Sequence, residues 1–155
     1  MDIATVAKTS LENAINIVSK DLNALPEEAF TKSFGGQART VADIVYELNV
    51  VNDYFGALLR GESPPPFDPS QGWIKAPADF NQKSEIIAAF DAAAKRAKET
   101  VDAMTVEELS KPIEGDDAGR TVYNRASMLS THLMYHSGQF NFIQTMLGDG
   151  DWHWA

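Results

Sequence analysis

Residues 131–148 read THLMYHSGQFNFIQTMLG, and this stretch guides our interpretation of the fold. Its apolar residues recur every three or four positions, which is the spacing of one face of an α-helix. The apolar positions on that face are Leu129, Leu133, Phe140, Ile143 and Leu147. Gly148 and Gly150 then interrupt the pattern, as glycines do at helix ends. The spacing predicts a helix that begins near Thr121 or Val122 and runs to Leu147.

Three earlier segments have the same periodicity, over residues 3–25, 40–61 and 82–104, and a short helical turn is predicted at 106–109. Thr40 with Asp43 three residues later is typical of a helix start. No stretch of comparable length alternates like a β-strand. Four long helices in 155 residues predict an all-α four-helix bundle that forms a single domain over residues 1–155.

The connections between these helices are long for a bundle, particularly residues 26–39 and 61–81. The second contains GESPPPFDPSQGW, whose four prolines exclude a helix or an internal strand. We interpret it as an ordered connection within one domain, because the helices on either side need each other to bury their apolar faces. Long ordered loops often cover a functional site.

Composition excludes several classes of function. Asp and Glu number 22 against 13 Lys and Arg, a net charge of −9 that argues against nucleic acid or an anionic membrane as a partner. The absence of cysteine excludes disulfides, cysteine nucleophiles and thiolate metal sites. The sequence also has no apolar run of the length of a membrane span and no signal peptide at its start. We therefore expect a cytoplasmic protein in which His, Asp, Glu or backbone groups would hold any metal.

His132 and His136 are the first candidates for such a site. They lie four residues apart, so both imidazoles project from the same face of the last helix, near the edge of its apolar stripe. Two histidines one turn apart can bind one metal ion. The alternative is a pair of core histidines that form hydrogen bonds with their neighbours, and spacing alone leaves both interpretations open.

Glu47 is the candidate for a third ligand. A helical wheel places it near Val51 and Leu58, at the edge of the buried face of the second helix. A carboxylate turned inward is costly unless it is paired or binds a cation. Glu47 would then bind a metal, remain partly solvated at the rim, or pair with His132, His136 or Arg125.

The sequence resembles the DinB-like superfamily of small four-helix-bundle proteins along nearly its whole length. The most specific part is His132, three residues, His136, and then Gly138-Gln139. The second part is the helix opening at residues 40–44, TVADI, a small hydroxyl residue followed by Val, any residue, an acidic residue and an apolar residue. In this family a histidine usually follows that opening and completes a three-histidine site for a divalent ion.

Glu47 stands here where the family usually has its third histidine. The resemblance implies a site of His132, His136 and Glu47 for nickel or zinc in the first place, and iron or manganese in the second. It further implies a metal-dependent enzyme, either a thiol-dependent transferase or isomerase or a hydrolase. Its substrate would be a small molecule, with a low-molecular-weight thiol as a candidate partner. The alternative is a non-catalytic small-ligand-binding or stress-response protein whose metal site is degenerate at Glu47.

Trp152 and Trp154 lie beyond the end of the last predicted helix. Tail residues are usually polar and mobile, so two tryptophans imply a surface that covers them. They would either fold back over the mouth of the bundle near the candidate site or meet a second subunit. Aromatic residues are enriched in interfaces and two-fold dimers are the commonest oligomers. We therefore predict a homodimer.

Overall fold

The second long helix begins with hydrogen bonds that its sequence predicts. The Thr40 hydroxyl accepts a hydrogen bond from the amide of Asp43 at 3.1 Å, and the Asp43 carboxylate accepts one in return from the amide of Thr40 at 3.4 Å. This reciprocal cap satisfies two of the amides left free at a helix start. It fixes the first turn of the helix that carries Glu47.

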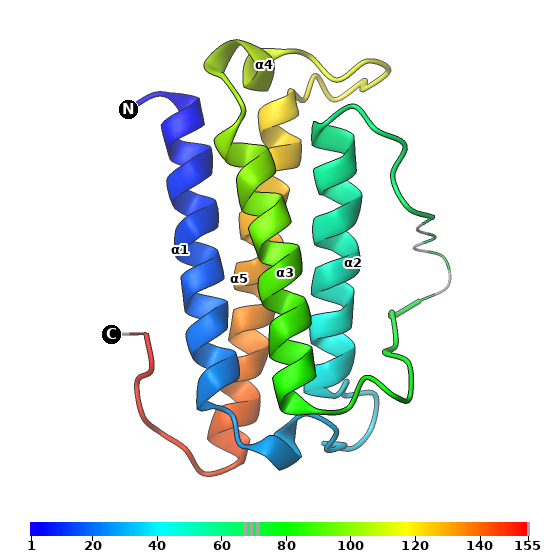
Figure 1. Cartoon of the computed structure of the whole chain (residues 1–155), viewed down its shortest axis with the longest axis vertical. Coiled ribbons are helices and arrows are strands. Elements are labelled where there is room, and N and C mark those ends of the chain that lie inside the picture. The colour runs from blue at the N-terminus through cyan, green and yellow to red at the C-terminus, as the bar shows by residue number, and fades with distance from the viewer. Residues whose placement is uncertain (67, 69, 71, 155) are drawn as a thin grey trace.

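Our computed structural model describes residues 1–66, 68, 70 and 72–154 of the chain (Figure 1). The long helices are α1 (Ile3–Ala24), α2 (Val41–Leu59), α3 (Lys83–Asp102) and α5 (Val122–Met146). Two short helices, η1 (Glu27–Ala29) and α4 (Val106–Ser110), lie in the connections. The predicted all-α fold is confirmed, and the predicted helices match these within a few residues at each end.

The directions of the four long helices explain why one connection is so long (Figure 1). Helices α1 and α5 run one way, while α2 and α3 run the other. Helix α1 packs against α3 and α5, and α2 packs against the same two helices. Because α2 and α3 are parallel neighbours, the chain between them must return along the full length of the bundle. The described residues of this return segment, 60–66, 68, 70 and 72–82, lie on the outside of α2.

That return segment is fixed to α2 near the segment's end. The amide of Ala76 donates a hydrogen bond to the second carboxylate oxygen of Asp43 at 2.8 Å. The ring of Phe80 packs edge-on against Tyr46, with 5.6 Å between centroids. Asp43 therefore caps α2 and also holds the neighbouring loop, which brings Trp73 to the end of the bundle where α2 begins.

All four long helices contribute apolar side chains to one core. Its largest fully buried residues include Leu11, Leu22, Leu48, Phe90, Leu129 and Phe140. Among the described residues, the buried polar and charged side chains are Asp21, Glu47, Asn52, His136, Ser137 and Gln144. Two of these are carboxylates, and each faces α5 from a different helix.

The C-terminal tail folds back onto α1. The indole Nε1–H of Trp154 donates to Asp21 at 2.9 Å, and the Lys20 ammonium donates to the Trp154 carbonyl at 3.0 Å. The tail therefore packs on α1, away from the side of α5 that faces Glu47. Trp152 remains 75% exposed, and the homodimer stays a prediction. No helix in the described part of the chain is long and apolar enough to cross a bilayer.

Candidate metal centre

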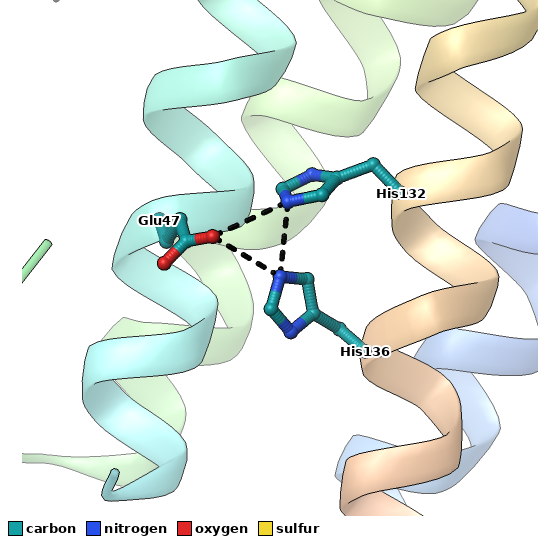
Figure 2. Close-up of side chains that lie close together, drawn as sticks. All are labelled: Glu47, His132 and His136. Atoms are coloured by element: carbon teal, nitrogen blue, oxygen red, sulfur yellow. Dashed lines mark hydrogen bonds and ion pairs between the residues drawn. The ribbon is translucent and has the colours of Figure 1, made fainter. Parts of the chain in front are cut away.

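Glu47, His132 and His136 meet between α2 and α5 (Figure 2). The two Nε2 atoms lie 3.0 Å apart, and Glu47 Oε1 lies 3.3 Å from each of them. His136 is fully buried, and the side chains of His132 and Glu47 are each 11% exposed. The sequence predicted that these three side chains would converge, and the structure places them together.

This cluster follows from the local structure of both helices. On α5 the four-residue spacing stacks the two imidazoles on one side, as expected for a helix. On α2 Glu47 directly precedes the fully buried Leu48, and this part of α2 packs against α5. The carboxylate is thus turned inward by the same apolar pattern that buries the helix face.

The three donor atoms fit one metal ion. Ligand atoms about 2.1 Å from a metal are about 3.0 Å apart at right angles and about 3.4 Å apart at tetrahedral angles. The separations of 3.0 and 3.3 Å between the donor atoms of this cluster fall within that interval. Two imidazoles and one carboxylate form a ligand set used for zinc and for iron, with positions left for solvent or substrate. Glu47, His132 and His136 are therefore close enough, and of the right chemistry, to hold a metal.

Arg39 is the cationic partner of Glu47. Its guanidinium pairs with Oε2 of the carboxylate, the oxygen that does not face the histidines, and its side chain is 10% exposed. Sequence analysis missed Arg39, because it lies before the cap of α2 where no periodicity indicates its direction. The only sequence signal was indirect, since an inward-facing glutamate requires a cation.

The predicted alternative pairing of Glu47 with Arg125 is wrong. Arg125 lines a separate pocket with Tyr54 and Asp116. It shares a sector of the helical wheel with His136, but the separation of eleven positions between 125 and 136 corresponds to about 16 Å of helix rise. A wheel gives direction around a helix and says nothing about height along it.

Gln139 determines which nitrogen of His136 carries the proton. The Gln139 carbonyl oxygen accepts from Arg39 at 3.3 Å and lies 2.9 Å from Nδ1 of His136. Since an arginine only donates and a carbonyl oxygen only accepts, Nδ1 must be the protonated nitrogen. The Nε2 lone pair of His136 then points at the cluster, which is the tautomer that a metal ligand needs.

His132 has the opposite arrangement. Its Nε2 faces two acceptors, the Nε2 of His136 and the Glu47 carboxylate, so this nitrogen carries the proton in the metal-free cluster. Its Nδ1 is buried and has no hydrogen-bond partner among the described residues. Coordination through Nε2 would require His132 to move its proton to Nδ1. His136 is thus preset for a metal, whereas His132 must change tautomer.

The surroundings of Glu47 and His136 favour an ionised carboxylate and a neutral imidazole. Burial alone would raise the pKa of Glu47, but its contacts with His132 and His136 and the charge of Arg39 hold that pKa well below the ordinary value of 4.5. Burial lowers the pKa of His136 and outweighs the opposing effects of Glu47 and Gln139. An ionised carboxylate beside a neutral imidazole is the state that binds a cation.

A pocket adjoins the cluster at the end of the bundle where α2 begins. It has a volume of about 330 Å³ and is bounded toward the cluster by Arg39 and Gln139. Trp73, from the proline-rich connection between α2 and α3, lines this pocket. His153, the remaining histidine of the chain, lies in the C-terminal tail and contacts Asp149 at 2.9 Å. It takes no part in the cluster.

The comparisons with known proteins agree with this architecture. The sequence matches the family model of the DinB superfamily over residues 10–140, which is most of the chain. The chain belongs to the DinB superfamily. A crystal structure of a conserved protein from Enterococcus faecalis has a similar fold, with a TM-score of 0.71 at 14% sequence identity, covering 96% of this chain and 99% of that chain. No curated protein is similar enough to count as a match.

By the resemblance described for the sequence, Glu47 stands at the position of a third histidine. The two histidines of α5 keep the family pattern, and the carboxylate takes the place where the resemblance implies a third histidine. The structure shows which charges lie at this position. A negative charge now lies in the cluster, and Arg39 lies beside it as a counter-charge.

Proposed function

We propose that this DinB-superfamily protein is a divalent-metal-dependent enzyme that acts on a small molecule, with Glu47, His132 and His136 as the metal ligands. The observation that supports this proposal is the convergence of three buried donor atoms at 3.0 to 3.3 Å from one another. Nickel and zinc suit the two imidazoles, while iron and manganese suit the carboxylate. A bound ion would lower the pKa of a coordinated water or thiol and supply a nucleophile at neutral pH.

The surrounding residues would each have a defined role. Arg39 holds Oε2 of Glu47, which leaves Oε1 for coordination and favours a carboxylate that binds through one oxygen. Gln139 keeps His136 in the tautomer whose Nε2 is free to coordinate. The resemblance to the family favours a thiol-dependent transferase or isomerase, or a hydrolase, as the reaction class.

Thermal melting with and without metal tests the proposal. Protein purified without an affinity tag and treated with a chelator should melt at a higher temperature in zinc or nickel. A ligand at 100 times its dissociation constant adds about 2.7 kcal/mol, which for a chain of this size is roughly 5–10 °C. His136→Ala should lose this gain, and His153→Ala is the matched control that should keep it.

Enzymatic turnover is tested separately. The conjugation of cysteine with 1-chloro-2,4-dinitrobenzene reports thiol transfer, because the thiolate displaces chloride. We expect zinc- or nickel-loaded protein to accelerate this reaction and His136→Ala to be inactive. Metal binding without any acceleration of thiol transfer or of ester hydrolysis would contradict the enzymatic part of the proposal.

A second candidate function is a non-catalytic binding or stress-response protein. The Arg39–Glu47 ion pair favours it, because the charge of the carboxylate is already balanced without a metal. Under this alternative, saturating zinc or nickel would leave the melting temperature of the wild-type protein unchanged.

A further inference from the structure

The pocket beside the metal centre combines apolar walls with a single charged group. Phe34, Trp73, Phe142 and Met146 are among its apolar lining residues. Among the described residues that line it, Arg39 is the only charged one, and Gln37 and Gln139 are the polar side chains. Its volume of about 330 Å³ is at the lower end of the range for small-molecule sites.

Arg39 has hydrogen-bonding capacity that the protein does not use. A guanidinium carries five N–H donors in one plane. One goes to Glu47 and one to Gln139, and the described residues accept none of the remaining three. One face of the guanidinium lies on the ring of Trp73, 4.3 Å from its centroid. The group is therefore held in place by three neighbours and still has donors for a ligand.

The charge balance favours an anion in this pocket. Glu47 offsets Arg39 in the metal-free protein, so the pair is close to neutral. A divalent ion at the centre would add two positive charges beside Arg39. Binding of an anion in the pocket and of a metal at the centre should then reinforce each other, since such coupling is reciprocal.

We propose that this pocket binds a small organic acid, with its carboxylate on Arg39 and an apolar or aromatic group against Phe142 and Met146. The inference rests on the proposed function, because it names the substrate class of that metal centre. A planar guanidinium matches the two oxygens of a carboxylate. The mostly apolar walls and single arginine favour a monoanion with an apolar body over a multiply charged phosphate.

Calorimetric titration of the zinc-loaded protein with phenylacetate, and with phenylacetamide as its neutral counterpart, tests this inference. We expect millimolar binding of phenylacetate, at least tenfold tighter than that of phenylacetamide. The tenfold preference corresponds to about 1.4 kcal/mol. The same titration on chelator-treated protein should give weaker binding of phenylacetate.

Two matched variants locate the binding. Met146→Glu places a carboxylate at the pocket wall, at a side chain that is 50% exposed and tolerant of substitution. It should weaken phenylacetate binding at least tenfold without weakening zinc binding. Met134→Glu adds the same charge on α5 outside the pocket lining, at a side chain that is 38% exposed, and should change neither.

The outcomes separate this inference from the proposed function. Zinc binding together with equal affinity for phenylacetate and phenylacetamide, or with no millimolar binding of phenylacetate, overturns the organic-acid pocket and leaves the metal centre intact. If Met146→Glu and Met134→Glu have equal effects on phenylacetate binding, the result overturns the placement of phenylacetate in this pocket. Selective binding of phenylacetate by a protein that takes up no zinc supports the pocket and contradicts the proposed function.

Discussion

Two buried carboxylates face α5 from opposite sides, and the protein uses them differently. Glu47 approaches from α2 and meets His132 and His136, with Arg39 behind it. Asp21 approaches from α1, accepts a hydrogen bond from the Ser137 hydroxyl at 2.6 Å, and accepts another from the indole of Trp154 at 2.9 Å. The α5 residues that receive them, His136 and Ser137, are adjacent in sequence.

The two carboxylates differ in the groups that surround them. Asp21 accepts from neutral donors, and burial raises its pKa although the hydrogen bonds from Ser137 and Trp154 oppose this. Glu47 is also buried, yet its basic neighbours hold its pKa below the ordinary value. A buried carboxylate among bases is prepared to hold a cation, whereas one among neutral donors anchors a segment of the chain. Burial alone would not distinguish a metal ligand from a structural acid.

The largest expected effect comes from changing the charge of Glu47, the carboxylate that faces the two histidines. Glu47→Gln keeps the shape but loses the anionic ligand, so zinc affinity should fall about 100-fold or more, because loss of a supporting contact alone costs 10- to 100-fold. Glu47→His restores the three-histidine set that the resemblance implies and should retain zinc. Calorimetric titration with zinc measures both. Equal zinc affinity of wild type and Glu47→Gln would mean that Glu47 is not a ligand.

Removing the counter-charge should destabilise the metal-free protein. Arg39→Met leaves Glu47 buried without its cation and should cost about 3 kcal/mol. Arg96→Met is the matched control, because Arg96 forms a half-exposed pair with Asp53 that should contribute under about 1 kcal/mol. Urea denaturation measures both, and zinc should reduce the loss for Arg39→Met by restoring a positive charge. A loss as small as that of the control would contradict the role of Arg39.

The two carboxylates should give opposite pH dependences of the free energy of unfolding in metal-free protein. The raised pKa of Asp21 adds stability below its ordinary value of 3.8, and this contribution is lost as the pH rises through the raised value. The lowered pKa of Glu47 adds stability above 4.5 that is lost as the pH falls. The free energy of unfolding of Asp21→Asn should therefore fall less than that of wild type between low and neutral pH. Urea denaturation across this pH range measures both.

The corresponding experiment with Glu47→Gln should give the reverse result. This variant should lose less stability than wild type as the pH falls below 4.5, because it has no carboxylate to protonate. Identical pH profiles for Asp21→Asn and Glu47→Gln would contradict the distinction between the two acids.

The smallest expected effect concerns the tail that Asp21 anchors. Trp154→Phe removes the indole N–H and should cost about 1 kcal/mol of stability. Trp152→Phe should change stability by less, because Trp152 is 75% exposed. Thermal melting compares the two variants, and zinc affinity should be unchanged in both. A change in zinc affinity for Trp154→Phe would show that the two sides of α5 are coupled.

Much of this site could be predicted from the sequence because it depends on helix periodicity. The spacing of His132 and His136 fixes their common face, and the wheel position of Glu47 turns it inward. Arg39 could not be predicted in the same way, because its position depends on where the chain from α1 meets the start of α2. The wrong pairing with Arg125 has the same origin, since tertiary packing sets which turns of two helices lie at the same height. The role of Asp21 could not be predicted either, because nothing in the sequence places Trp154 beside it.

Zinc stoichiometry tests the central claim most directly. Untagged protein is stripped with a chelator, incubated with zinc, desalted and measured for zinc per chain, for wild type, His136→Ala and His153→Ala. We predict one ion per chain in wild type and in His153→Ala, and a loss of more than nine tenths of it in His136→Ala. Equal zinc content in His136→Ala and wild type, or none in wild type, would contradict a metal centre formed by Glu47, His132 and His136.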